Sequence, residues 1–91
     1  MRVIVSREAR ESLKAISAYL SQYSPAAARR TRFEINARIK TLPLNPRKGR
    51  KVPEYDVDAI REVIEGDYRI WYRLSHERIE IIAIFHGARG V

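Results

Sequence analysis

Residues 66–74, Gly-Asp-Tyr-Arg-Ile-Trp-Tyr-Arg-Leu, constrain the fold more than any other part of the sequence. A Gly-Asp turn signal is followed by aromatic and branched residues, which favour a β-strand whose side chains alternate between two faces. The face that suits a core would hold Tyr68, Ile70, Tyr72 and Leu74. The opposite face would hold Arg69, Trp71 and Arg73. This second, cationic and aromatic face is either a site for an anionic partner or a solvated surface.

Two more segments in the C-terminal half have strand character. Residues 59–65 and 78–85 are rich in branched residues, and short connections at residues 66–67 and 75–77 join them to the central strand. Such short turns predict a three-stranded antiparallel meander. The last segment is apolar at adjacent as well as alternate positions: Ile79, Ile81, Ile82, Ile84 and Phe85. We therefore expect this strand to be buried on both faces or to face a partner.

The N-terminal half predicts one strand and two helices. Residues 2–5 form a short apolar strand candidate at a sheet edge, and Ser6 is a suitable N-cap for the helix that follows. The apolar stripe of this helix is Ala9, Leu13, Ile16, Leu20 and Tyr23. A second helix starts at Ser24 and Pro25 and stops at Pro43. Its stripe is Ala28, Ile35, Ile39 and Leu42, with Phe33 beside it.

The expected fold class is therefore α+β, in a single domain of residues 1–91. An N-terminal strand, an antiparallel helix hairpin and the three-stranded meander would form one sheet packed on the helices. The absence of cysteine excludes disulfides and thiolate metal sites and suits a reducing compartment. No apolar run approaches the roughly 20 residues that a bilayer span needs. We expect a cytoplasmic protein without membrane contact.

Positive charge is concentrated in one segment. Residues 29–51 hold nine basic residues and one acidic residue, so they carry +8, more than the +7 of the whole chain. The candidates for partner contact in this segment are Arg29, Arg30, Arg32, Arg38, Arg47, Lys48, Arg50 and Lys51. Such asymmetry indicates an acidic protein partner or nucleic acid, although basic helix faces are often only solvated. The basic loop at residues 44–53 is the stronger candidate, unless it is merely a linker.

Several kinds of chemistry lack the residues they need. No serine lies in a Gly-x-Ser-x-Gly elbow, and neither a phosphate-binding loop nor a dinucleotide-binding fingerprint occurs. The two histidines, His76 and His86, share no metal-ligand spacing. We therefore expect neither a metal nor a cofactor.

Strand periodicity leaves one possible catalytic cluster. Arg61, Arg69 and His86 could share a sheet face, with Glu54 and Arg89 in segments that enter or leave it. The arginines could hold a phosphate, and His86 could act as general acid or base with Glu54 as its complement. This arrangement would suit RNA cleavage by the internal 2′-hydroxyl. Alternatively, His86 is a structural hydrogen-bonding residue, and the arginines form cross-strand ion pairs with glutamates.

Two strings in the C-terminal half resemble the RelE/ParE superfamily of bacterial toxins. They are residues 60–73, Ile-Arg-Glu-Val-Ile-Glu-Gly-Asp-Tyr-Arg-Ile-Trp-Tyr-Arg, and residues 82–89, Ile-Ala-Ile-Phe-His-Gly-Ala-Arg. The strand and two helices of the N-terminal half agree, so the resemblance covers essentially the whole chain. It implies a small toxin from a type II toxin–antitoxin pair.

The superfamily has two activities. RelE-like members cleave mRNA on the ribosome, which would make Arg61, Arg69, His86 and Glu54 catalytic. The chain departs from that pattern, because the C-terminal tyrosine of RelE-like members has no counterpart after His86 and the lysines at the start of their sheet are not evident. ParE-like members poison DNA gyrase without nuclease chemistry, and the length and the His-Gly-Ala-Arg ending resemble them more closely. We therefore favour a ParE-like gyrase inhibitor, with an mRNA endonuclease as the alternative; only the second would be an enzyme.

The resemblance also implies a protein partner. Such toxins are held inactive by an acidic antitoxin, whose initially disordered segment would fold on the toxin, meet the arginines of residues 29–51 and form a hetero-oligomer. Trp71, Arg73 and Arg89 would add to this contact surface. Outside the toxin class, one alternative is a non-toxic nucleic-acid-binding module, which would bind in a steeply salt-dependent way and leave growth unaffected.

Overall fold

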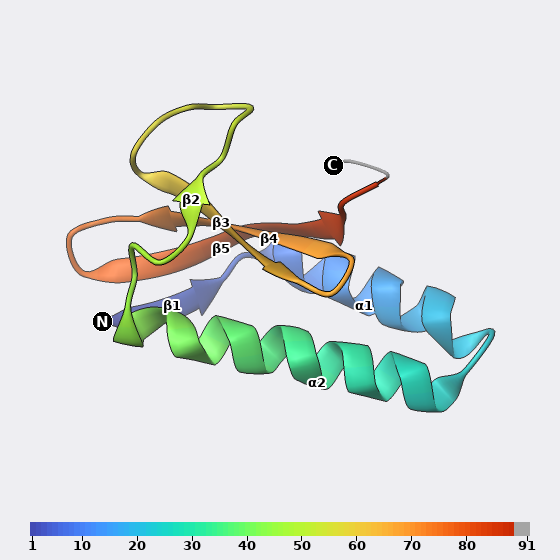
Figure 1. Cartoon of the computed structure of the whole chain (residues 1–91). Helices are drawn as coiled ribbons and strands as arrows, with labels where there is room; N and C mark the ends of the chain where they lie inside the picture. The colour runs from blue at the N-terminus through green and yellow to red at the C-terminus, as the bar shows by residue number, and fades with distance from the viewer. Residues whose placement is uncertain (89–91) are drawn as a thin grey trace.

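A mixed five-stranded sheet and a helix hairpin make up the fold in the computed structural model, which describes residues 1–88 (Figure 1). The elements follow in the order β1 (Arg2–Val5), α1 (Arg7–Ser21), α2 (Pro25–Thr41), the 3-10 turn η1 (Leu42–Leu44), β2 (Arg50–Lys51), β3 (Ile60–Glu65), β4 (Tyr68–Leu74) and β5 (Arg78–His86). The strand order is β1-β5-β4-β3-β2; β1 is parallel to β5, and the other pairs are antiparallel. The predicted α+β class and its helix hairpin are confirmed.

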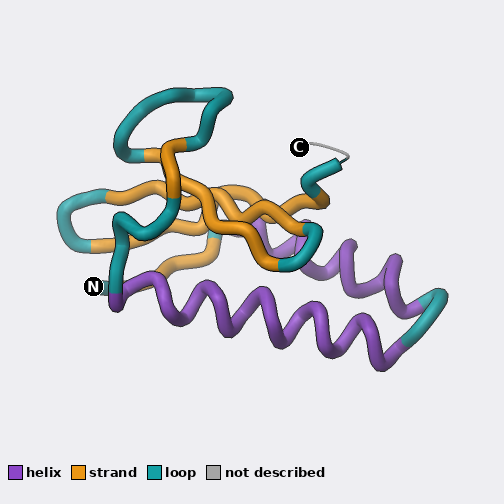
Figure 2. The backbone as a smooth tube through the Cα atoms, in the orientation of Figure 1, coloured by secondary structure: helices purple, strands orange, loops and turns teal. Residues whose placement is uncertain are grey.

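The two helices begin where their capping residues predict. The Ser6 hydroxyl accepts a hydrogen bond from the Ala9 N–H at 3.0 Å, and the Ser24 hydroxyl accepts one from the Ala27 N–H at 3.1 Å. Each cap satisfies an N–H that has no partner within its helix. Figure 2 shows the helices side by side along one face of the sheet, with the tight turn between them. Because α1 ends at Ser21, Tyr23 belongs to this turn and is 73% exposed, instead of closing the apolar stripe.

The main core lies between the helix hairpin and the sheet. The fully or nearly fully buried members from the helices and η1 are Ala9, Leu13, Ile35, Ile39 and Leu42. Those from the strands are Val63, Ile70, Tyr72, Ile79, Ile81 and Ile84. Alternation along β4 is therefore as predicted, with Ile70 and Tyr72 toward the helices. At about 25 cal/mol per Å² of apolar surface, burial in this layer is the main stabilising term of the fold.

A bulge in β5 explains why that strand is apolar at adjacent positions. Trp71 pairs with Ala83, whereas Tyr72 pairs with Ile81, so Ile82 is an extra residue in the ladder. The extra residue reverses the alternation, and both Ile81 and Ile84 consequently face the helices. On the other face of the sheet, hereafter the outer face, a second small cluster is formed by Val52, Trp71 and Phe85.

The segment between α2 and β3 is more ordered than a solvated linker. β2 pairs with β3 through Arg50 and Lys51, opposite Glu62 and Arg61. The buried Tyr72 hydroxyl donates to the Pro46 carbonyl at 2.7 Å and accepts from the Gly49 N–H at 3.0 Å. A Cβ at Gly49 would lie 2.5 Å from the Glu62 carbonyl oxygen and 2.6 Å from the Tyr72 oxygen, so this close approach requires glycine.

Candidate functional site

The cationic face predicted for β4 is held by a network of ion pairs centred on Arg69. Its Nη1 and Nη2 atoms each lie 2.9 Å from a carboxylate oxygen of Glu54, and its Nε lies 2.5 Å from Glu62. The guanidinium carbon also lies 5.2 Å from the centre of the Trp71 ring and 5.3 Å from that of Phe85. Bidentate pairing and ring stacking together fix the plane of the guanidinium.

Glu62 is the buried carboxylate of this network. Its side chain has no exposed surface, and it accepts hydrogen bonds from Arg69, from Arg50 at 2.6 Å and from the Trp71 indole at 2.8 Å. Burial alone would raise the pKa of Glu62, but the bonds from Arg69, Arg50 and Trp71 outweigh burial and lower it. Arg50 lies directly opposite Glu62 in the β2–β3 ladder, so the network joins three strands.

Glu54 closes the network from the loop between β2 and β3. Its hydrogen bonds with Arg69 lower the pKa of Glu54 to about 2. The same bonds from Glu54, followed by those from Glu62, raise the pKa of Arg69 above its ordinary value. Glu54 is thus a permanent anion at neutral pH that neutralises Arg69, instead of a proton-transfer partner for His86.

The expected shared face of Arg61, Arg69 and His86 does not form. In the ladder, Arg61 pairs with Tyr72 and His86 pairs with Tyr68, which places both on the helix side of the sheet, whereas Arg69 lies on the outer face. Tyr68 and Tyr72 are four residues apart along β4, so Arg61 and His86 are offset by about 13 Å along the strands at 3.3 Å per residue, and β4 also lies between them. The two-residue turn at residues 66–67 sets the register that puts Arg61 opposite Tyr72. The bulge at Ile82 in β5 turns His86 to the helix side.

Arg61 and His86 each have a local structural contact. Arg61 donates from Nη1 to the Gly49 carbonyl at 2.9 Å and from Nε and Nη2 to Asp58, tying together the segments on both sides of β2. The His86 ring meets the Tyr68 ring edge-on, with 5.5 Å between centres, and its Nδ1 accepts from the Ala88 N–H at 3.1 Å. His86 therefore makes a structural hydrogen bond, as in the alternative interpretation. Arg61 does not form the cross-strand ion pair with a glutamate that this interpretation expected, because it bonds to Asp58 and to backbone carbonyls.

Trp71 differs from its expected role as an exposed contact residue. Its side chain is only 4% exposed, because Val52 and the edge-on ring of Tyr55 from the β2–β3 loop cover it. Its neighbour on the same face, Arg73, is exposed and pairs with Glu80 directly opposite on β5. Arg89, the remaining predicted contact residue, lies outside the described residues.

The cations of residues 29–51 divide into a paired and an unpaired group. In the loop, Arg47 pairs with Asp58, Arg50 with Glu62 and Lys51 with Asp56. Within residues 1–88, no ion pair is made by a group of exposed cations: Arg29, Arg30, Arg32, Lys40 and Lys48. Four of these five lie on α2, so the helix, rather than the basic loop, presents the available charge.

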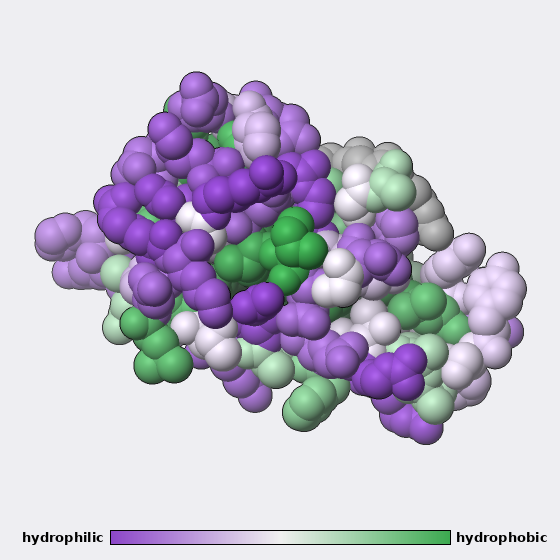
Figure 3. Space-filling model, in the orientation of Figure 1, coloured by the Kyte–Doolittle hydropathy of each residue, from purple (hydrophilic) through white to green (hydrophobic). Residues whose placement is uncertain are grey.

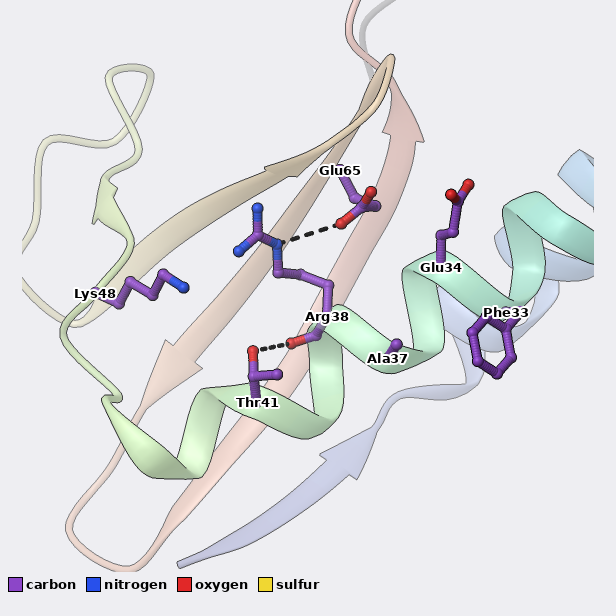
Figure 4. Close-up of a pocket in the computed structure, with 7 residues that line it drawn as sticks. All are labelled: Phe33, Glu34, Ala37, Arg38, Thr41, Lys48 and Glu65. Atoms are coloured by element: carbon purple, nitrogen blue, oxygen red, sulfur yellow. Dashed lines mark hydrogen bonds and ion pairs between the residues drawn. The ribbon is translucent and has the colours of Figure 1, made fainter.

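A groove of about 280 Å³ separates α2 from β3 (Figure 4). It is lined by Phe33, Glu34, Ala37, Arg38, Thr41, Lys48 and Glu65. Arg38 crosses the groove from α2; its Nε lies 3.4 Å from Glu65, and its Nη2 donates to the Ile64 carbonyl at 3.0 Å. Phe33, predicted to lie beside the buried stripe, is 74% exposed here.

The described residues offer no centre for a metal ion, because no three His, Cys, Asp or Glu side chains gather among them. None of the helices in that part of the chain is long and apolar enough to cross a membrane.

Comparison with known proteins shows to which family the chain belongs. A family model described as the ParE toxin of the type II toxin–antitoxin system parDE matches residues 3–91. The chain belongs to the ParE toxin family. It is similar to a chain of the solved structure "Chromosomal ParDE TA system from P. aeruginosa", with 22% identity, a TM-score of 0.76, and coverage of 94% of this chain and 95% of that one. At this identity the structural likeness shows a shared fold. No curated protein matches the sequence.

Two central contacts of this ParE toxin were not predicted from the sequence. They are the hydrogen bonds of the buried Glu62 carboxylate and those of the Tyr72 hydroxyl. The signal for Glu62 was present, because a two-residue turn pairs Glu65 with Tyr68 and therefore Glu62 with Trp71. An acid facing an indole N–H on a covered sheet face predicts a buried acceptor. Nothing in the sequence connected Tyr72 to the backbone of residues 46–49, because that contact depends on the course of the loop.

Proposed function

We propose that this ParE toxin inhibits DNA gyrase in the cytoplasm and is neutralised by a cognate acidic antitoxin, with which it forms a hetero-oligomer. The observation that supports this proposal is the arrangement of Arg61, Arg69, His86 and Glu54. Two of them form a closed ion pair on the outer face, and the other two lie on the opposite face. A ribonuclease needs a phosphate-binding cation and a general acid or base within hydrogen-bond reach of one substrate. Inhibition by binding needs no such cluster.

The unpaired cations of α2 support the antitoxin part of the proposal. Arg29, Arg30 and Arg32 carry positive charge that no carboxylate in residues 1–88 neutralises. An acidic segment of a partner would supply the carboxylates. Charges of opposite sign accelerate association and select the partner more than they add affinity. A disordered acidic segment that folds on the toxin would use this attraction during encounter.

The test is induction of the toxin in cells without antitoxin, followed by separate measurement of DNA synthesis and protein synthesis. We expect DNA synthesis to stop first, and the purified toxin to block supercoiling by gyrase and to accumulate cleaved DNA. The His86→Ala variant should act equally well, because the interactions of the histidine with the Tyr68 ring and the Ala88 N–H are structural. Gyrase that is unaffected at saturating toxin, together with early arrest of protein synthesis that His86→Ala abolishes, would overturn the proposal in favour of mRNA cleavage.

Neutralisation is tested by co-expression with the product of the open reading frame that adjoins the toxin gene. We expect the two proteins to purify together and growth to recover. A toxin that remains active and purifies alone would contradict the antitoxin part of the proposal.

A further inference from the structure

Another pocket, of about 330 Å³, lies where α1 and α2 pass the end of β1, and is called the α1–α2 pocket below. Its polar lining residues are Arg10 and Lys14 from α1 and Arg32 and Asn36 from α2. Figure 2 shows the two helices side by side, running back from the turn that joins them. Lys14 and Arg32 are equally far from Tyr23 along the chain, as are Arg10 and Asn36. The polar side chains of the two helices therefore line the pocket from opposite sides.

The lining of this pocket is cationic and contains no acid. Arg10, Lys14 and Arg32 make no ion pair within residues 1–88. Arg10 and Lys14 are also four residues apart on one helix, a spacing at which like charges repel each other. In the described part of the chain, the pocket is lined by none of the acids of the two helices, Glu8, Glu11 and Glu34. A bound anion would relieve the repulsion between these cations.

The groove between α2 and β3 shows the contrasting case. Its volume of about 280 Å³ is similar, and two cations, Arg38 and Lys48, line it. Two acids, Glu34 and Glu65, line the same groove, so its charges balance. Excess positive charge is therefore a property of the α1–α2 pocket and does not follow from the basic composition of the chain alone.

The floor of the α1–α2 pocket is apolar. Leu13 and Ile39 are only 6% and 5% exposed and belong to the main core, against which Val5 also packs. Figure 3 shows, by contrast, that hydrophilic residues cover most of one face of the toxin, where water surrounds charged groups. Cations beside apolar side chains are less screened by water and attract an anion more strongly. The pocket therefore suits a ligand with both an anionic and an apolar part.

The donors of the pocket suit a phosphate group. Arg10 is held in place because its Nη1 donates to the Val5 carbonyl at 2.8 Å. A guanidinium has five N–H donors, so Arg10 keeps donors for a ligand, and its planar fork matches two phosphate oxygens. Lys14 adds a compact charge, and the Asn36 amide can both donate and accept. With Arg32, three positive charges match a doubly charged phosphate better than a single carboxylate.

We propose that the α1–α2 pocket binds a small organic phosphate. The phosphate would lie among Arg10, Lys14 and Arg32, and the apolar part of the ligand would cover Leu13 and Ile39. The pocket volume of about 330 Å³ is at the lower end of the range for small-molecule sites, about 300–1,000 Å³. This inference does not depend on the proposed function, because it concerns neither gyrase nor the antitoxin.

The test is titration of the purified full-length toxin with three probes: phenyl phosphate, inorganic phosphate and phenol. NMR signals of the Asn36 side-chain amide and of the Leu13 and Ile39 methyl groups report on the pocket. We expect phenyl phosphate to bind on the order of tenfold more tightly than inorganic phosphate, because its ring covers apolar surface. Phenol, which has the ring without the charge, should bind most weakly.

Three single substitutions separate this pocket from the general charge of the toxin. Lys14→Gln and Arg32→Gln should each weaken the binding of phenyl phosphate on the order of tenfold. Both side chains are exposed, so circular dichroism should show an unchanged fold. Lys48→Gln is the matched control, because it removes one charge from the groove between α2 and β3. It should weaken binding by about twofold or less, through the loss of distant and screened charge.

Selective loss in Lys14→Gln and Arg32→Gln, with tighter binding of phenyl phosphate than of inorganic phosphate, supports the proposal. If Lys48→Gln weakens binding as much as Lys14→Gln, or both phosphates bind equally, the toxin attracts anions only by its net charge and the proposal is wrong. Unchanged NMR signals of the pocket at saturating phenyl phosphate would also overturn it. A short DNA duplex that displaces phenyl phosphate at lower concentration would overturn it in favour of a contact with nucleic acid.

Discussion

The outer face of the sheet and the surface of α2 both display arginines, but they use them differently. On the sheet, Arg69 is held by two carboxylates and two aromatic rings. On α2, Arg29 and Arg30 are exposed and make no ion pair within residues 1–88. The contrast shows that a cationic, aromatic strand face can serve the fold, while a helix face that looks merely solvated holds the charge available to a partner.

The largest effect should follow from removing the buried carboxylate at the centre of the sheet network. Glu62→Gln keeps an acceptor for Trp71 but leaves Arg69 and Arg50 without their shared anion. Breaking a buried ion pair in this way costs about 3 kcal/mol of unfolding free energy. Urea denaturation measures it. The matched control is Glu80→Gln at the exposed pair with Arg73, where we expect at most about 1 kcal/mol. Equal losses in the two variants would mean that the network is no more than a surface feature.

The next effect should come from the close approach of the loop to the sheet. Gly49→Ala places a methyl group against the Glu62 carbonyl and the Tyr72 hydroxyl, and we expect a loss of about 2 kcal/mol in unfolding free energy. At Gly87 the nearest atom to an added Cβ is 3.4 Å away, so Gly87→Ala is the matched control and should change stability little. If Gly49→Ala is as stable as the control, the loop does not depend on the sheet for its course.

Acid should weaken the sheet network, because its carboxylates are ion-paired with arginines in the folded protein. The pKa of Glu54 is about 2 in the folded toxin and 4.5 ordinarily, so its contribution to stability is complete above pH 4.5 and is lost as the pH falls toward 2. The pKa of Glu62 is lowered as well, which adds loss of the same sign. Unfolding free energy measured from pH 6 to pH 2 should therefore fall less steeply in Glu54→Gln than in the parent. Glu77→Gln, in the β4–β5 turn, controls for the loss of one carboxylate.

The smallest effect concerns the unpaired cations. Replacing both Arg29 and Arg30 by Gln should slow association with the antitoxin on the order of threefold at low salt and leave toxin stability unchanged. Stopped-flow mixing at several salt concentrations measures the rate. Replacing Arg47 and Lys51, which already pair with Asp58 and Asp56, is the comparison that should slow it less. If replacing Arg47 and Lys51 slows association more than replacing Arg29 and Arg30, the partner contact lies on the loop and not on α2.

Elements with local signals were predictable from the sequence. Ser6 and Ser24 cap the helices through contacts three residues away, and the alternation of β4 is visible in seven consecutive residues. Features that depend on the pairing of strands were not predictable from the sequence. β2 is only Arg50–Lys51, which has no strand preference of its own, and the bulge at Ile82 reverses the face of every later β5 residue. Grouping Arg61 with Arg69 was an avoidable error, since the two-residue turn already sets their opposite faces.

The most direct test of the central claim, that the outer-face arginine serves the fold and not the chemistry of toxicity, is a double replacement. Glu62→Gln with Arg69→Met removes the buried charge pair as a unit while keeping an acceptor for Trp71, and replacing such a pair together costs far less than breaking it. We predict that this variant is folded and that its effect on DNA synthesis in antitoxin-free cells equals that of the parent. A variant that is folded but leaves DNA synthesis and growth untouched would contradict the account.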